Sequence, residues 1–167
     1  MDAITIQILR NKVASLVDET FDLPAAAEAY RTRKAAEAQF DEFIRLIDSG
    51  HSDDAYSLGH RIVDGPRRDD SRLMLALADR IVSGDRNVPR PDLELARQAA
   101  KRAVNLTHGT DPGAFGVSAR TEFLAGDTAK AVSLQTRAVD LAEDGMRQAL
   151  EKELAAYRAA DAPASRP

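Results

Sequence analysis

The sequence predicts an all-α fold, a right-handed α-solenoid of about three helix pairs with a capping helix at each end. Apolar residues recur every three or four positions along most of the 167 residues, and no stretch alternates as a strand does. Short turns rich in Gly, Pro and Asp separate these segments, which favours antiparallel neighbouring helices. Small residues also recur at a matching register in successive segments. We therefore expect one helical-repeat domain over 1–160 and a disordered tail at 161–167.

The N-terminal region, 1–35, is expected to contribute helices that precede the repeats. Its apolar spacing predicts a helix over 3–18, which would cover the next helix as an N-terminal cap. Pro24 suits the first turn of that second helix, because a proline has no amide hydrogen to leave unpaired there. The second helix is expected to reach about Ser49 and to end at Gly50, where glycine readily adopts a left-handed cap.

The first repeat is placed at 36–69. It joins the end of the long helix to a shorter helix, which Ser52 would cap by accepting a hydrogen bond from the free amides of the first turn. The shorter helix is expected to stop near Gly65 and Pro66, since a glycine followed by a proline breaks helical structure.

The second repeat is placed at 70–109. Apolar spacing predicts a helix over 70–82, followed by a polar loop at 83–91 that contains two prolines. Asp92 is expected to cap the second helix of this pair, and Gly109 to end it.

The third repeat is placed at 110–144. It begins at Asp111-Pro112, where a capping carboxylate is followed by a residue suited to the first helical turn. Gly126-Asp127 would reverse the chain into the second helix of the pair, and Gly145 would end that helix.

A final helix over 145–160 is expected to cap the C-terminal end of the array. Repeats bury their faces only against neighbours, so the last pair needs a cover. The residues predicted to face the array are apolar and helically spaced: Met146, Leu150, Leu154 and Tyr157.

Two of the expected helices share a pattern of small and apolar residues at the same spacings. These are Ala96, Ala103, Val104 and Leu106 in one helix and Ala131, Ala138, Val139 and Leu141 in the other. Ala55, Ile62 and Val63 repeat the pattern in part. Ala96 and Ala131 lie about 35 residues apart, close to the tetratricopeptide period of roughly 34. We interpret the alanines as seams where neighbouring helices approach closely.

An alanine-rich bundle without a repeat is the alternative, since alanine is common in helices through propensity alone. Aromatic residues are also sparse for a tetratricopeptide array. Phe115 falls at its tryptophan-like position, Phe123 falls beside its tyrosine position, and the chain has no tryptophan.

Residues 24–160 resemble the helical-repeat tail of some bacterial thioredoxin-like proteins. The resemblance is carried by "ARQAAKRAVNLTHGTDP" at 96–112 and "ARTEFLAGDTAKAV" at 119–132. It implies the repeat fold and a role in contacting other proteins. It does not imply redox activity, because the thioredoxin domain and its cysteine pair are absent. Since such relatives are often exported, export is the alternative to a cytoplasmic location.

The residues predict no catalytic, cofactor or metal site. Without cysteine there is no thiolate nucleophile and no cysteine metal ligand. His51, His60 and His108 form no helical metal-binding pair and have no obvious carboxylate partner in the sequence. Neither a glycine-rich phosphate loop after a strand nor a serine-nucleophile motif occurs. We expect that the protein is not an enzyme.

The charge balance argues against nucleic acid and anionic membrane as partners. The formal net charge is −4, and the short basic pairs give no basic face. No apolar run approaches the roughly 18 residues of a membrane span. The N-terminus lacks the basic region of a secretory signal, so a cytoplasmic location is the default expectation.

The fold predicts a non-catalytic adaptor that holds a protein or peptide on the concave face formed by the first helices of each pair. The residues assigned to this face by register are Phe40, Ile44, Leu75, Asp79, Arg120, Phe123 and Leu124. Some of them are expected to serve as core. Leu75 and Asp79 fall where tetratricopeptide clamps for chaperone tails carry a basic and an amide residue, so no such clamp is expected.

Two alternative functions remain from the sequence. One is a structural or self-associating protein, with a homodimer formed by end-to-end stacking of the repeats. The other is an accessory of a separate thioredoxin-like redox protein, which the resemblance suggests.

Overall fold

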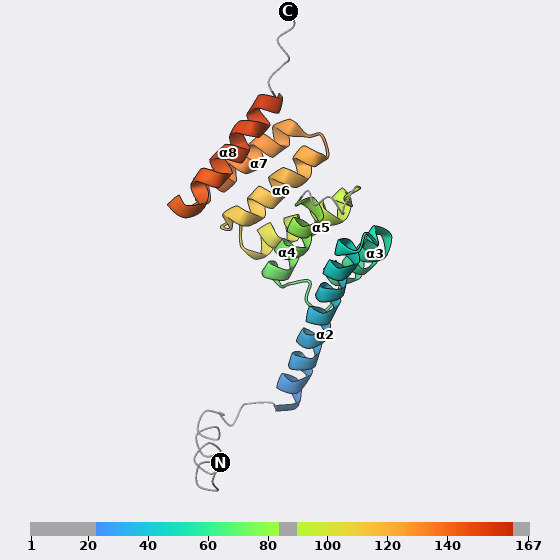
Figure 1. Cartoon of the computed structure of the whole chain (residues 1–167). Coiled ribbons are helices and arrows are strands. Elements are labelled where there is room, and N and C mark those ends of the chain that lie inside the picture. Colours follow the sequence, from blue (N-terminus) through green and yellow to red (C-terminus); the bar gives the residue numbers. More distant parts are fainter. Residues whose placement is uncertain (1–22, 84–89, 162–167) are drawn as a thin grey trace, which may run out of the picture. The chain divides into compact units, whose positions relative to one another are not determined.

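Every regular element that the structure describes is an α-helix, which confirms the predicted all-α class. The structure is a computed structural model and describes residues 23–83 and 90–161 (Figure 1). The helix expected over 3–18 and the tail beyond Asp161 lie outside the described residues. The chain divides into two compact units, 1–35 and 36–167.

Helix α2, Leu23–Asp48, crosses the boundary between the two units. In the first unit its side chains are largely exposed, with Tyr30 at 62%. There Arg31 Nη1 lies 2.8 Å from Glu28 Oε2, a pair one helical turn apart. In the second unit Phe43 and Ile47 are fully buried, so the C-terminal turns of α2 belong to the core of that unit.

Helices α3, Ser52–Val63, and α4, Ser71–Val82, follow short turns. The prediction that Ser52 caps α3 is wrong. The carbonyl of His51 accepts the first helical hydrogen bond, from Ala55 N at 3.0 Å, so His51 is the capping residue and Ser52 lies inside the helix. The His51 side chain makes no capping bond, and its Nδ1 lies 2.9 Å from Ser49 Oγ instead.

Aspartates cap the next four helix starts. Asp70 accepts from two amides of α4, and the other three precede α5, Leu93–Leu106, α6, Pro112–Leu124, and α7, Thr128–Leu141. Asp92 accepts from Leu95 N at 2.9 Å, and Asp127 accepts from Lys130 N at 3.0 Å. The predicted caps at Asp92 and Asp111 are therefore confirmed. These equivalent bonds also give α5 and α7 a common register.

Helix α8, Asp144–Asp161, corrects two details of the predicted C-terminal region. Gly145 does not end α7, because α7 stops at Leu141 and the extended backbone of Ala142 leads directly into α8. Gly145 is instead the second residue of α8. Met146 does not face the other helices, since it is 47% exposed, whereas Leu150, Leu154 and Tyr157 are buried as predicted.

In the second unit the helices from α4 to α8 pack in chain order. Each of α5, α6, α7 and α8 contacts the helix before it, and α4 also contacts α6, while α3 contacts α5. Figure 1 shows α6, α7 and α8 lying side by side. The pair α4–α5, which holds Ala96, therefore adjoins the pair α6–α7, which holds Ala131.

The recurring alanines lie where these helices meet. All of them are fully buried: Ala55, Ala96, Ala103, Ala131 and Ala138. Their burial agrees with the interpretation of the pattern as seams, since a side chain no larger than a methyl group lets helix backbones approach closely. The largest core cluster extends from α2 to α6, and smaller clusters lie around Ala131 and Ala138.

Enlarging a seam alanine is expected to strain this packing. Ala131→Leu should lower the free energy of unfolding by about 1–3 kcal/mol, because the fully buried site has no room for an isobutyl group. Urea denaturation followed by circular dichroism measures the change. Ala129→Leu, at an exposed position of the same helix, is the control and should stay within about 0.5 kcal/mol. Equal effects of the two changes would contradict the seam.

Replacing each of two glycines by alanine should change the free energy of unfolding in opposite directions. Gly126 has a φ of +87° in the turn before α7, so Gly126→Ala should cost about 1 kcal/mol through backbone strain alone, since no atom lies within 4 Å of the added methyl group. Gly145 lies in a helix with equally open surroundings, so Gly145→Ala should raise the free energy of unfolding by about 0.5–1 kcal/mol. Thermal unfolding of both variants measures whether stability falls in the first and rises in the second.

Candidate functional site

The residues predicted to form a binding face come from three helices and serve different roles. Phe40 and Ile44 lie on α2, Leu75 and Asp79 on α4, and Arg120, Phe123 and Leu124 on α6. The aliphatic and aromatic residues of α2 and α4 in this set, Phe40, Ile44 and Leu75, are partly buried against the largest core cluster. Leu124 is 45% exposed. A binding role for this set stays a prediction.

The structure does bring Arg120 and Asp79 together. Arg120 Nη1 lies 3.2 Å from Asp79 Oδ1, and Nη2 lies 2.7 Å from Glu153 Oε1 on α8. Burial lowers the pKa of Arg120, but the hydrogen bond to Glu153 and the two nearby carboxylates outweigh it and raise the pKa overall. The guanidinium is therefore a charged and compensated link between α4, α6 and α8.

A second pair on this face is aromatic. The rings of Phe123 and Tyr157 stack with their centroids 4.6 Å apart, which fixes α6 against α8. The ion pairs of Arg120 and this stack therefore hold helices of the second unit together. The partners on α8, Glu153 and Tyr157, were not part of the predicted set.

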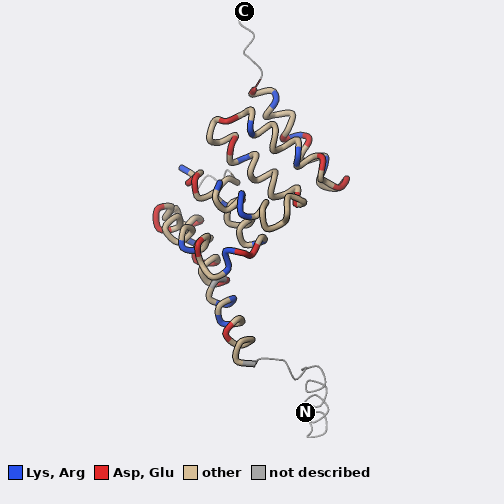
Figure 2. Tube along the Cα trace, turned by 180° about the vertical axis from the view of Figure 1, so that it is seen from behind, with Lys and Arg blue, Asp and Glu red and all other residues tan. Residues whose placement is uncertain are grey.

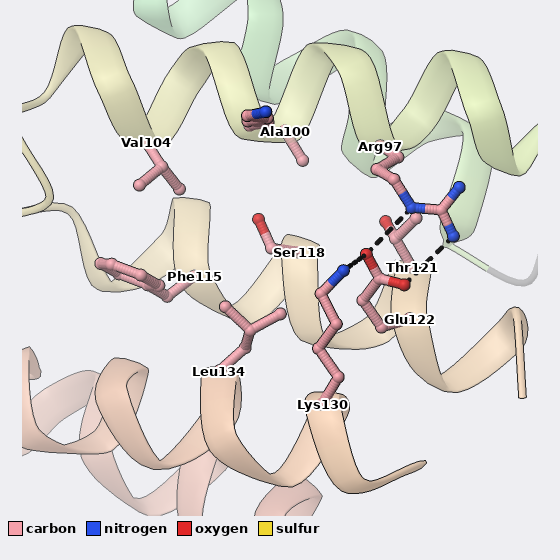
Figure 3. Close-up of a pocket in the computed structure, with 10 residues that line it drawn as sticks. Arg97, Ala100, Val104, Phe115, Ser118, Thr121, Glu122, Lys130 and Leu134 are labelled. Carbon is pink, nitrogen blue, oxygen red and sulfur yellow. Dashed lines mark hydrogen bonds and ion pairs between the residues drawn. The ribbon is translucent and has the colours of Figure 1, made fainter. Parts of the chain in front are cut away.

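Sequence reasoning missed a groove on the surface formed by α5, α6 and α7. It has a volume of about 310 Å³. Figure 3 shows α5 on one side, α7 on the other and α6 between them. One end is apolar and is formed by Ala100, Val104, Phe115 and Leu134. The other end carries charged residues, and Lys101 also belongs to the lining.

Helical spacing places the groove residues on one face of each helix. On α5, Arg97, Lys101 and Val104 follow one another at intervals of three or four residues, while the alanines at 96, 99 and 103 occupy the buried face. The floor on α6 is less polar than its composition suggests. Ser118 Oγ donates to Ala114 O at 2.8 Å, and Thr121 Oγ1 donates to Val117 O at 2.8 Å.

Glu122 links the two sides of the groove at its charged end (Figure 3). Its Oε1 lies 3.0 Å from Arg97 Nε on α5 and 2.8 Å from Lys130 Nζ on α7, and its Oε2 lies 3.1 Å from Arg97 Nη2. The Glu122 side chain is 6% exposed. The Arg97 hydrogen bond is the largest influence on the pKa of Glu122 and, helped by Lys130, lowers it despite burial.

At one register that α5 and α7 share, α5 has a leucine and α7 has a lysine. On α5, Leu95 packs so closely on Gly59 of α3 that a methyl group at Gly59 would come within 2.6 Å of Leu95 Cδ2. Lys130 occupies the position of Leu95 on α7, since each donates its amide to the capping aspartate. The Lys130 side chain reaches Glu122, and the apolar contact found between α3 and α5 is not repeated between α5 and α7. Lys130, a charged residue at a register that is apolar in α5, was the feature of the sequence that could have indicated the groove.

The groove is locally basic on an acidic chain. Arg97, Lys101 and Lys130 line it, and Glu122 is the one acidic residue of its lining. No carboxylate among the described residues lies within ion-pair distance of Lys101, which is exposed. Elsewhere on the described helices, basic and acidic positions are interspersed (Figure 2). The groove thus differs from its surroundings in both charge and shape.

The histidines do not gather into a reactive centre in the described part of the chain. His60 Nε2 lies 3.1 Å from Asp92 Oδ2, a partner 32 residues away that the sequence analysis did not find. This contact ties α3 to the start of α5. No group of three or more His, Asp or Glu residues within 23–83 and 90–161 is arranged to hold a metal ion.

No protein-family model matches the chain, and no curated protein matches it either. The resemblance to helical-repeat tails therefore stays a prediction. None of the helices at 23–83 and 90–161 combines the length and the apolar character needed to cross a membrane.

Removing the charge of Glu122 is expected to weaken the fold in a pH-dependent way. At neutral pH Glu122→Gln should lower the free energy of unfolding by about 1–2 kcal/mol. This is less than the roughly 3–5 kcal/mol for breaking a fully buried pair, since Arg97 and Lys130 remain partly solvated.

The pH dependence follows from the lowered pKa of Glu122 in the folded state. The contribution of its carboxylate is complete above the ordinary pKa of 4.5 and is lost as the pH falls through the lower folded pKa. The difference between wild type and Glu122→Gln should therefore shrink below pH 4.5 in urea titrations at several pH values. Glu151→Gln, at an exposed position of α8, is the control. A difference that stays constant down to acidic pH would contradict the assignment.

Proposed function

We propose that the chain is a non-catalytic protein- or peptide-binding adaptor, built as a tetratricopeptide-like α-solenoid. In this arrangement α2 from residue 36 onward forms the first helix pair with α3, α4–α5 and α6–α7 are the second and third pairs, and α8 is the C-terminal cap. The contacts of α6 with α4, α5 and α7 support it, because the first helix of a stacked pair meets both helices of the preceding pair. The fully buried seam alanines support it as well.

The observation that carries the binding role is the open groove between α5 and α7. Its apolar end is accessible at the surface, whereas the apolar residues that form the largest core cluster are buried. An accessible apolar hollow beside charged side chains is typical of a site that receives part of another molecule.

The chemistry of the groove favours binding over catalysis. General acid–base catalysis works best with a pKa near the working pH, usually reached by raising that of a carboxyl group. Glu122 has the opposite shift and is held between two cations, so it remains ionised and engaged at neutral pH. Its role in this proposal is to fix the two sides of the groove.

Self-association is a second candidate, because two large apolar residues of the second unit are exposed among the described residues. Leu124 at the end of α6 and Met146 in α8 are 45% and 47% exposed. A homodimer could cover them. The role as an accessory of a separate thioredoxin-like protein stays an expectation from the resemblance alone.

A selection from a random peptide display library tests the adaptor proposal. We expect enriched peptides with dissociation constants on the order of 10 µM, a strength suited to a small site. Binding is measured by fluorescence anisotropy on wild type, on Ser118→Leu, which fills the groove, and on Leu124→Asp, which alters the predicted face. Loss of binding in one of these folded variants would support the proposal.

The same samples separate the two candidates. Sedimentation velocity over a wide concentration range should show a monomer if the exposed apolar residues do not drive self-association. A library that yields no peptide binding below about 1 mM would contradict the adaptor proposal. A concentration-dependent dimer that Leu124→Asp dissociates would favour the second candidate.

A further inference from the structure

The groove between α5 and α7 is small for a ligand pocket. Small-molecule pockets usually measure roughly 300–1,000 Å³. The groove, at about 310 Å³, lies at the lower end of that range. Its apolar end, between Val104, Phe115 and Leu134, offers one large aliphatic or aromatic side chain contact on three helices. Such a pocket is typical of the anchor position of a peptide.

The charge of the groove indicates which residues of a bound segment should flank the apolar anchor. Lys101 has no carboxylate partner among the described residues, and Lys130 keeps half of its side chain exposed while it contacts Glu122. Arg97 pairs with both Glu122 and the neighbouring Glu94, and Lys130 pairs with Glu122, so the excess positive charge of the lining is carried by Lys101. A segment rich in Asp and Glu would complement it, whereas a basic segment would be repelled.

The groove is also held open before any ligand arrives. The bonds of Glu122 to Arg97 and Lys130 fix the separation of α5 and α7 at the charged end. Arg97 is held further by Glu94, whose Oε2 lies 2.8 Å from Arg97 Nη1. A preformed site loses less conformational freedom on binding, so a short segment is sufficient.

We propose that this groove binds a short acidic peptide segment of another protein. Its single large apolar side chain seats against Val104, Phe115 and Leu134, and the flanking Asp or Glu carboxylates lie against Lys101 and Lys130. The inference rests on the proposed adaptor function and adds to it the place and the chemical class of the ligand.

Three fluorescently labelled synthetic peptides of about ten residues test the proposal. The first has a central Phe flanked by Asp and Glu, the second has the same Phe flanked by Lys, and the third keeps the acidic flanks but carries Ser at the centre. Anisotropy titrations should show the first peptide binding about tenfold or more tightly than the other two. Equal binding of all three would overturn the proposal.

A matched pair of charge reversals locates the site. Lys101→Glu should weaken binding of the acidic apolar peptide about three- to tenfold, because it reverses a charge at the rim of the groove. Lys152→Glu makes the same change in net charge at an exposed position of α8, outside the groove lining, and should leave the affinity unchanged. An equal loss in both variants indicates general electrostatic attraction and overturns the proposal.

A filling variant tests the apolar end independently of charge. Ser118→Leu should abolish binding of the first peptide while thermal unfolding confirms that the variant is folded. If Ser118→Leu does not fold, Leu134→Ser serves instead, because it removes one apolar wall without adding volume. Unchanged affinity in a folded variant overturns the proposal.

The outcomes also separate this inference from the adaptor function on which it rests. If library-selected peptides bind and respond to Leu124→Asp but not to Lys101→Glu, the adaptor function stands and the groove assignment fails. If neither the library nor the synthetic peptides give binding, both fail. If Lys101→Glu dissociates a dimer seen by sedimentation, the occupant is a second copy of the chain, and the proposal of an acidic partner is overturned.

Discussion

The close approach of neighbouring helices through alanine is the constraint on which the second unit depends. At Ala55, Ala96, Ala103, Ala131 and Ala138 the side chain is reduced to one methyl group and is fully buried. Larger residues there would separate the helices and expose apolar surface, so the seams decide which helices can be neighbours. Capping aspartates act on the same arrangement, because each fixes where a helix begins and hence the register of its alanines.

The groove lies where α5 and α7 differ at an equivalent position. Leu95 of α5 packs against Gly59 and closes the junction of α3 with α5. On α7 the position equivalent to Leu95 is occupied by Lys130, which lines the groove. Lys130 cannot bury its ammonium in an apolar junction and instead reaches Glu122. The polar link thus substitutes for an apolar contact and leaves a hollow with an apolar end. The proposed function rests on this difference between α5 and α7.

Charge pairing separates the two surfaces considered for binding. On the predicted face, Arg120 lies between Asp79 and Glu153, so its charge is already satisfied and it serves to join three helices. In the groove, Arg97 pairs with Glu122 and Glu94 and Lys130 pairs with Glu122, whereas Lys101 has no acidic partner among the described residues. A surface with uncompensated charge gains more from an oppositely charged ligand than one whose charges are internally paired. This contrast favours the groove.

Residue patterns alone were enough to predict the all-α class, the ranges of the described helices to within a few residues, the caps at Asp92 and Asp111 and the small residues at helix contacts. These features depend on residues near one another in the chain, through periodicity, capping and backbone freedom. It misjudged Ser52 and Gly145, because helix ends are decided within a residue or two by how the chain enters its neighbours. The contacts of Glu122 with Arg97 and of His60 with Asp92, and the groove between α5 and α7, became evident only in the folded chain. Those contacts join residues far apart in sequence, and no local pattern specifies them.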